Sequence, residues 1–397
     1  MNSMPAPATE PKAAAAFSAD GFEYIATNFE NASPLWYEIG DNGAIQVHLL
    51  YDHERSSSNR AAGHFHFQVQ AAPGSKLAIE FRNLNNVWNG RPSWVGKAFR
   101  KAMISEDGRS WRPVALEIAP NELARLTIEM PGPRLFVARV EPYRLSDLDR
   151  LLDEIAAHPQ VHIAPIGKTF EGRTLEIVRI GDPSASHRVF LRARSHPWES
   201  GTNWVVQGLI RRLLEDDDDA KAFRARYCAY IMPMANKDGV ARGATRFNLQ
   251  GKDLNRNWGE PADAALAPEN HALEAWLEEA IRVGKPPDLA IDLHNDAGGL
   301  LHFSHLPIAN LDSFRTRMEV FEALLRRHSW FTEGSSSPES RNAGTLGDGW
   351  LERYGILAFT HELNCNWIAG LNEHAAGRHW EAYGASMAKV IHEFFAA

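Results

Sequence analysis

The chain has 397 residues, of which 44% are hydrophobic and 23% are charged, so it can bury apolar cores and remain in solution. Its length exceeds that of an ordinary domain, roughly 100–200 residues, and predicts two domains. The formal net charge of -8 gives no field that attracts a polyanion, so we expect no nucleic-acid partner.

The N-terminal segment and the cysteines indicate neither export nor membrane insertion. Residues 1–18 lack a basic start and a continuous apolar core, and we interpret them as a flexible tail. The two cysteines, Cys228 and Cys365, cannot make a disulfide framework. No uninterrupted apolar run reaches the roughly 18 residues of a membrane span. We therefore expect a cytoplasmic protein without a membrane partner, and its oligomeric state stays open.

Short alternating runs fill residues 19–142 and are typical of strands with one buried face. The clearest runs are Ile45–Tyr51, His64–Val69, Lys76–Phe81 and Ala124–Met130. Asn-Gly, Pro-Gly and Asp-Gly turns separate runs of this kind, and no convincing helix interrupts them. This part of the chain is therefore predicted to be an antiparallel β-sandwich domain.

The pattern changes after Pro142, and residues 143–397 are predicted to form an α/β domain. Leu145–Ile155 repeats apolar residues at helical spacing behind a Ser146 or Asp147 cap. Apolar strands then alternate with helical stretches. The expected strands are Arg188–Ala193, Tyr227–Met232, Leu289–Leu293 and Ile356–Thr360. The expected helices are Asn203–Glu215, Pro268–Val283, Leu311–Arg327 and His379–Phe395.

Metal-ligating side chains follow the ends of two predicted strands, where open α/β sheets place their ligands. His196 and Glu199 follow the strand that ends at Ala193, and His294 follows the strand that ends at Leu293. Two histidines and one glutamate are a ligand set of catalytic zinc, with a fourth position open for water. A single His-x-x-Glu is a weak signal in a chain with 17 histidines.

The order of further polar segments strengthens this interpretation. Asn236–Gly239, Arg246 and Asp253–Trp258 lie between the first ligands and His294, and Glu362 follows the last predicted strand. In this order the segments resemble the zinc metallocarboxypeptidase family typified by the pancreatic carboxypeptidases, and most closely its cytosolic carboxypeptidase branch. The resemblance runs from about residue 145 to 397.

The resemblance implies a mixed-sheet, three-layer α/β/α zinc carboxypeptidase domain preceded by a β-sandwich. It implies one zinc ion per chain, held by His196, Glu199 and His294. Glu362 would be the general base that takes a proton from the attacking water. Arg246 would stabilise the oxyanion that forms at the scissile carbonyl.

The substrate implied by the resemblance is the C-terminal residue of a peptide or protein. Asn255 and Arg256 would bind its terminal carboxylate, a task suited to a planar guanidinium. Cytosolic carboxypeptidases often remove glutamate, and Arg194 and Arg341 are the candidates for pairing with an acidic side chain. Asp292 either orients His294 or is an ordinary buried hydrogen-bonding residue, and both interpretations stay open.

Some positions depart from the family's pattern. Lys237 replaces the proline of an Asn-Pro-Asp-Gly turn, and Trp198 replaces the glycine of His-Pro-Gly-Glu. Residues 341–350 contain no tyrosine to match the one that closes over the substrate in the pancreatic enzymes, and Tyr354 lies close to the final strand. The role of that tyrosine is unassigned.

Two other functions remain as hypotheses. The first is a zinc-dependent amidase or deacylase that acts on small N-acyl amino acids. Relatives of that kind generally lack the complete Asn-Arg-Asn segment, which this chain has at Asn255–Asn257. The second is a non-enzymatic binding module, against which the presence of all three ligands and Glu362 argues.

Overall fold

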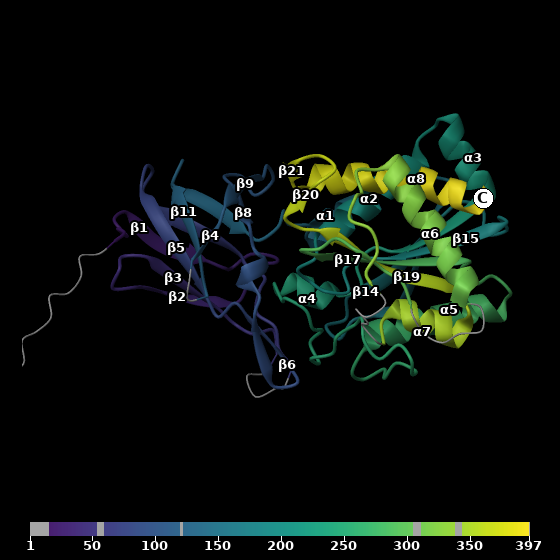
Figure 1. The fold of residues 1–397 in the computed structure, drawn as a ribbon, viewed down its shortest axis with the longest axis horizontal. Coiled ribbons are helices and arrows are strands. Elements are labelled where there is room, and N and C mark those ends of the chain that lie inside the picture. Colours follow the sequence, from purple (N-terminus) through teal and green to yellow (C-terminus); the bar gives the residue numbers. More distant parts are fainter. Residues whose placement is uncertain (1–15, 54–58, 120–121, 305–310, 338–343, 397) are drawn as a thin grey trace, which may run out of the picture.

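The structure is a computed structural model that describes residues 16–53, 59–119, 122–304, 311–337 and 344–396. Figure 1 shows a β-rich N-terminal unit beside a larger α/β unit. Only residues 16–18 of the predicted tail are among the described residues. Within the described ranges, no helix is long and apolar enough to cross a membrane.

The N-terminal unit consists of two five-stranded sheets. One sheet has the order β1 (Phe22–Ala26), β4 (His66–Ala71), β12 (Arg134–Ala138), β8 (Lys101–Ser105), β9 (Arg112–Ala115). The other has the order β10 (Glu117–Ala119), β11 (Leu123–Glu129), β5 (Lys76–Arg82), β3 (Ile45–Leu49), β2 (Leu35–Ile39). Neighbouring strands are antiparallel except β3 and β5, which are parallel because the chain visits β4 in the opposite sheet between them.

Alternate residues of the two sheets form one core, as the period-two pattern predicts. Val47 of β3, Phe67 of β4 and Phe81 of β5 are fully buried in this core. A separate hairpin, β6 (Asn85–Trp88) and β7 (Arg91–Trp94), is followed by the short 3-10 helix η1 (Gly96–Ala98). Figure 1 shows β6 on the side of the N-terminal unit that faces the α/β unit.

The α/β unit is built on a seven-stranded mixed sheet. Its order is β13 (Val161–Lys168), β14 (Thr174–Ile180), β16 (Tyr227–Met232), β15 (His187–Arg192), β17 (Leu289–Asp296), β19 (Leu357–Asn364), β18 (Leu301–His302). The four strands from β16 to β19 are parallel, and β13, β14 and β18 pair antiparallel with their neighbours. A small ribbon of β20 (Trp367–Ile368) and β21 (Glu373–His374) follows β19.

Helices cover both faces of this sheet, which confirms the three-layer prediction. One face carries α1 (Leu145–Ile155), α2 (Gly201–Leu214), α6 (Leu311–His328) and α8 (Gly377–Ala396). The other face carries α5 (Pro268–Arg282) and α7 (Leu346–Tyr354). Two shorter helices, α3 (Asp218–Arg226) and α4 (Lys237–Ala241), flank β16 in the sequence.

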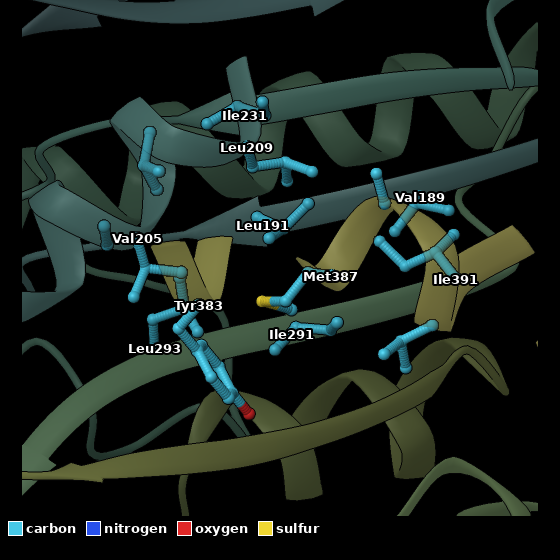
Figure 2. Close-up of a cluster of buried hydrophobic side chains, with 14 of the residues drawn as sticks. Val189, Leu191, Val205, Leu209, Ile231, Ile291, Leu293, Tyr383, Met387 and Ile391 are labelled. Atoms are coloured by element: carbon cyan, nitrogen blue, oxygen red, sulfur yellow. The ribbon is translucent and has the colours of Figure 1, made fainter. Parts of the chain in front are cut away.

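Successive residues of the central strands enter different cores, so both faces of the sheet are buried. On β15, Leu191 packs in the core beneath α2 and α8, whereas Phe190 packs against the layer of α5 and α7. Figure 2 shows Leu191 and Ile291 beside Met387 of α8 in the first of these cores.

The start of α1 differs from the prediction of a Ser146 or Asp147 cap. The helix begins at Leu145, with Arg144 as the residue before it. The Asp147 carboxylate accepts a hydrogen bond from the Arg144 backbone N–H at 2.7 Å. Asp147 lies within the first turn of the helix and accepts a hydrogen bond from the backbone N–H of the residue before the helix, as the acidic residue of a capping box does.

Candidate metal centre and active-site cavity

His196 and Glu199 lie in the turn between β15 and α2. Arg194 has a φ of 61°, in the left-handed region, and so turns the chain at the sheet edge. Gly201 starts α2, and a Cβ there would lie 2.8 Å from the Asn295 amide. The turn can therefore pack this closely against β17 only with glycine at that position.

His294 and Glu362 occupy neighbouring strands in register. Their Cα atoms are partners in the parallel pairing of β17 with β19. Because β15, β17 and β19 are adjacent and parallel, their carboxyl ends meet at one edge of the sheet. The turn that holds His196 and Glu199 follows β15 at this same edge.

The His196, Glu199 and His294 side chains converge on one point and are all buried. The Nδ1 atom of His196 lies 2.8 Å from Oε1 of Glu199, and the Nδ1 atom of His294 lies 2.9 Å from Oε2. The two Nδ1 atoms are 3.2 Å apart. Tetrahedral zinc ligands are separated by roughly 3.4 Å, so this spacing and this donor set fit a catalytic zinc site.

Carboxylates hold the other nitrogen of each imidazole. His196 Nε2 lies 3.0 Å from Asp253 Oδ1, and His294 Nε2 lies 2.8 Å from Asp292 Oδ2. An Nε2–H that donates to a carboxylate leaves the Nδ1 lone pair free to bind a metal. The arrangement supports the first of the two interpretations of Asp292, that it orients His294.

The electrostatic environment of this centre favours a cation. Burial alone would raise the pKa of Glu199, but His196 and His294 outweigh it and lower the pKa to about 2. Burial alone would lower the pKa of His294, but Asp292 and Glu199 raise it well above its ordinary value. A buried site that stabilises positive charge in this way suits a divalent metal ion.

Arg192 holds the Asp292 carboxylate that contacts His294. Arg192 was not identified in the sequence analysis. It is fully buried and donates to both oxygens of Asp292 at 2.7 Å. Its Nη2 atom also donates to Asn255 Oδ1 at 3.2 Å. Asp292 is therefore a bridge between a buried guanidinium and His294.

A cavity of about 810 Å³ opens next to the centre. Its lining includes His196, Glu199, Arg246, Arg256 and Glu362. The N-terminal unit contributes part of the wall, through Asn59, Gly63, Asn86, Trp88, Asn89, Val95 and Arg139. The size is typical of a small-molecule or peptide-end site.

Glu362 faces this cavity beside two further titratable groups. One carboxylate oxygen of Glu362, one of Asp296 and one ring nitrogen of His302 all lie within 4.8 Å of one another. Among the described residues, Glu362 Oε2 is buried and has no hydrogen-bond partner. Burial and the Asp296 carboxylate raise the pKa of Glu362 well above its ordinary value. A carboxylate with these properties can accept a proton near neutral pH.

Arg246 is fixed in the cavity wall by Asp253. Its Nε donates to Asp253 Oδ2 at 2.8 Å. Burial lowers the pKa of Arg246, but Asp253 and Glu199 outweigh it, and the guanidinium stays charged. The arrangement leaves a fixed positive charge at the edge of the metal centre.

Asn255 and Arg256 both line the cavity, but they differ in how many of their side-chain hydrogen-bonding atoms already have a partner. Asn255 Oδ1 already accepts from Arg192 and from the Leu346 backbone N–H at 2.9 Å, and its Nδ2 lies 3.0 Å from His294 Nε2. Arg256 has one described hydrogen bond, from Nη1 to the Asn255 carbonyl at 2.7 Å. The remaining guanidinium donors of Arg256 are thus the better placed for a ligand.

The structure does not bring Arg194 to the cavity. Its guanidinium is buried and donates to the Pro197 carbonyl at 2.7 Å and to Asn203 Oδ1 at 2.8 Å. Arg341, the second candidate for an acidic side chain, lies outside the described residues. Tyr354 donates to Glu274 at 3.2 Å, and no tyrosine lines the cavity in the part of the chain that the structure describes.

Comparisons with known proteins match this geometry. A sequence profile of the zinc carboxypeptidase family matches residues 148–374. An uncharacterized protein of Zymomonas mobilis is 26% identical over 268 residues, which are 66% of this chain and 65% of that protein. Cytosolic carboxypeptidase 6 of Caenorhabditis elegans is 35% identical over 144 residues, which are 34% of this chain and 31% of that protein. The chain thus spans less than two thirds of these relatives.

Solved structures share the fold of both units. A metallo-carboxypeptidase from Burkholderia cenocepacia has a TM-score of 0.81 at 22% identity, over 94% of this chain and 98% of that chain. A metallo-carboxypeptidase from Pseudomonas aeruginosa has a TM-score of 0.79 at 22% identity, over 94% and 100% of the two chains. Coverage this high includes the N-terminal sheets as well as the α/β unit.

Proposed function

This chain belongs to the zinc carboxypeptidase family, and on that premise we propose that it removes the C-terminal residue of peptides or proteins. The observation that carries the proposal is the convergence of His196, Glu199 and His294 on one point beside a cavity lined by Glu362 and Arg246. The donor set fits one zinc ion per chain.

Zinc at this point would supply Lewis acidity, which polarises the scissile carbonyl and makes water nucleophilic near neutral pH. The chain's own residues prepare the site for it. Asp253 and Asp292 hold the two imidazoles with their Nδ1 atoms toward the centre. Glu199 stays ionised because the neighbouring imidazoles lower its pKa to about 2.

Glu362 is the proposed general base. Its buried Oε2 atom has no partner among the described residues and borders the cavity. It would take the proton of the attacking water and pass this proton to the leaving amine. The raised pKa of Glu362 makes the carboxylate a stronger base and its protonated form an available acid.

Two arginines would each bind a negatively charged group of the substrate during the reaction. Arg246, held by Asp253, would stabilise the negative charge that develops on the carbonyl oxygen. Arg256 would bind the free carboxylate of the last residue, with Asn255 beside it. Binding of that carboxylate restricts cleavage to the C-terminal bond and makes the reaction that of an exopeptidase.

An acidic last residue is the finer hypothesis from the sequence. Arg194 is committed to Pro197 and Asn203, so it cannot contribute without breaking those bonds. Lys252 also lines the cavity and is a cation that could pair with an acidic side chain in its place. Asp348 lines the same cavity and would oppose such a preference.

The test is a digestion of matched peptides that end in Glu, Lys or Phe, with free or amidated C-termini, read by mass spectrometry. We expect loss of one residue from the free peptides and none from the amidated ones. Fastest release of Glu supports the acidic preference, and fastest release of Phe or Lys contradicts it. Cleavage of N-acetyl amino acids with no release from any peptide would favour the deacylase instead.

Location and partners remain part of this proposal. The two cysteines of the chain are buried and unpaired, and several relatives are named cytosolic carboxypeptidases. Both observations support a cytoplasmic enzyme whose partner is the C-terminus of a peptide or protein.

A further inference from the structure

The hairpin of β6 and β7 belongs to the N-terminal unit but forms part of the wall of the active-site cavity. Asn86 and Trp88 of β6 line this cavity together with His196 and Glu362. Two residues apart on a strand, their side chains share one face. The same face of the hairpin is thus turned toward the proposed centre of catalysis.

The hairpin lies against the residue proposed to face the scissile carbonyl. The Arg246 guanidinium sits over the Trp88 ring, with its central carbon 5.0 Å from the ring centroid. Phe247 meets the same ring edge-on, with centroids 5.9 Å apart. The hairpin therefore borders the Arg246 end of the cavity.

Asp52 of the N-terminal unit fixes this contact. Its carboxylate accepts from the backbone N–H groups of Arg246 and Phe247, the latter at 2.9 Å. It also accepts from the Ala61 N–H at 3.1 Å. One half-buried carboxylate thus ties the segment that carries Arg246 to the N-terminal unit. The hairpin wall and the proposed catalytic centre therefore form one site.

Asn86 offers this site an unused acceptor. Its Oδ1 atom is buried, and no described residue donates a hydrogen bond to it. Buried acceptors are nearly always paired, so an orphan in a cavity wall is a place where a ligand donor can bind. Peptide N–H groups are the donors that a polypeptide substrate brings.

We propose that the β6–β7 hairpin is a binding subsite for the substrate backbone upstream of the scissile bond. Asn86 Oδ1 accepts an upstream peptide N–H, and the exposed part of the Trp88 ring packs on the chain. The inference rests on the proposed function, because Arg256 must first place the C-terminus. The enzyme would then favour peptides that extend several residues upstream over acylated dipeptides.

The test compares kcat/KM for an acetylated tetrapeptide with that for an acetylated dipeptide with the same last two residues. The wild-type ratio should exceed one, and Asn86→Ala should lower it about fivefold, as expected for one lost hydrogen bond. Asn86→Asp keeps an acceptor and should retain the ratio. Arg91→Ala alters an exposed residue of the same hairpin that does not line the cavity, and is the matched control.

A second arm uses tetrapeptides N-methylated at each upstream amide in turn. N-methylation of one of these amides should lower the ratio of kcat/KM between tetrapeptide and dipeptide for the wild-type enzyme. The same methylation should leave this ratio unchanged for Asn86→Ala. A general structural defect in Asn86→Ala would lower kcat/KM equally for the two peptides and leave their ratio unchanged. An unchanged ratio in this variant would overturn the proposed subsite. Cleavage of neither substrate by the wild type would instead refute the proposed function.

Discussion

Asp253 Oδ1 lies 3.0 Å from His196 Nε2, while the other oxygen of the same carboxylate holds Arg246. One side chain thus orients a proposed zinc ligand and the proposed oxyanion group. We expect Asp253→Ala to weaken zinc binding about 10- to 100-fold, as loss of such partners generally does. Competition with a chelator of known affinity measures the effect.

A matched control for that experiment is Asp263→Ala, because Asp263 is an exposed residue that only caps a turn. Its zinc affinity should equal that of the wild type. Equal zinc affinity in Asp253→Ala and Asp263→Ala would show that Asp253 does not support zinc binding.

Arg192 and Asp292 form an ion pair without solvent exposure. Arg192→Met would remove the guanidinium that binds both oxygens of the buried Asp292 carboxylate and leave His294 as its remaining described partner. We therefore expect the free energy of unfolding to fall by about 3–5 kcal/mol. Urea denaturation of the zinc-free protein isolates this effect from metal binding. Arg282→Met, at an exposed pair with Glu279, should change little. Similar values for the two variants would show that the buried pair is not needed for stability.

Glu362→Gln preserves the size of the side chain and removes its basicity. We expect kcat to fall by about 10²- to 10⁴-fold with one zinc per chain retained, because proton transfer is lost and the metal ligands are untouched. Single-turnover kinetics together with metal analysis separate the two effects. A fall in kcat below about threefold would assign the proton transfer to another group.

His66 should make the N-terminal unit sensitive to acid. Burial lowers the pKa of His66 to about 3, against an ordinary value near 6.5. Between these values the unfolded chain binds a proton that the folded chain does not, so stability falls as the pH falls from about 6.5 toward 3. His66→Gln should reduce this dependence by about 1 kcal/mol per pH unit between pH 6 and 5.

Denaturant unfolding at several pH values measures that slope. Gln46→Ala, at a partly exposed position of β3, removes no titratable group; it is the control and should keep the wild-type slope. An unchanged slope in His66→Gln would mean that His66 does not remain neutral in the folded protein.

The periodicity of the sequence predicted most of the fold, because burial on one face or both leaves a repeating pattern. The apolar stretch of β15 predicted a strand, and the alternating stretch of β3 predicted a half-buried one. The parallel pairing of β3 with β5 could not be predicted, since it depends on a crossover through the opposite sheet. Periodicity records which face is buried and not which strand lies beside it.

The order of the polar motifs predicted the cluster of His196, Glu199 and His294, because strand ends of a parallel sheet meet at one edge. Arg192 was missed although a charge at the end of a buried strand was a usable signal: only a buried partner, here Asp292, makes it tolerable. Trp88 could not have been found, since it reaches the cavity only through contact between the units.

The most direct test of the metal centre is the zinc content of purified protein, measured by mass spectrometry for the wild type, His294→Ala and His162→Ala. His162 is an exposed histidine on β13 and serves as the control. We expect about one zinc per chain in the wild type and in His162→Ala, and almost none in His294→Ala. A full complement of zinc in His294→Ala would contradict the assignment of His196, Glu199 and His294 as the site of catalysis.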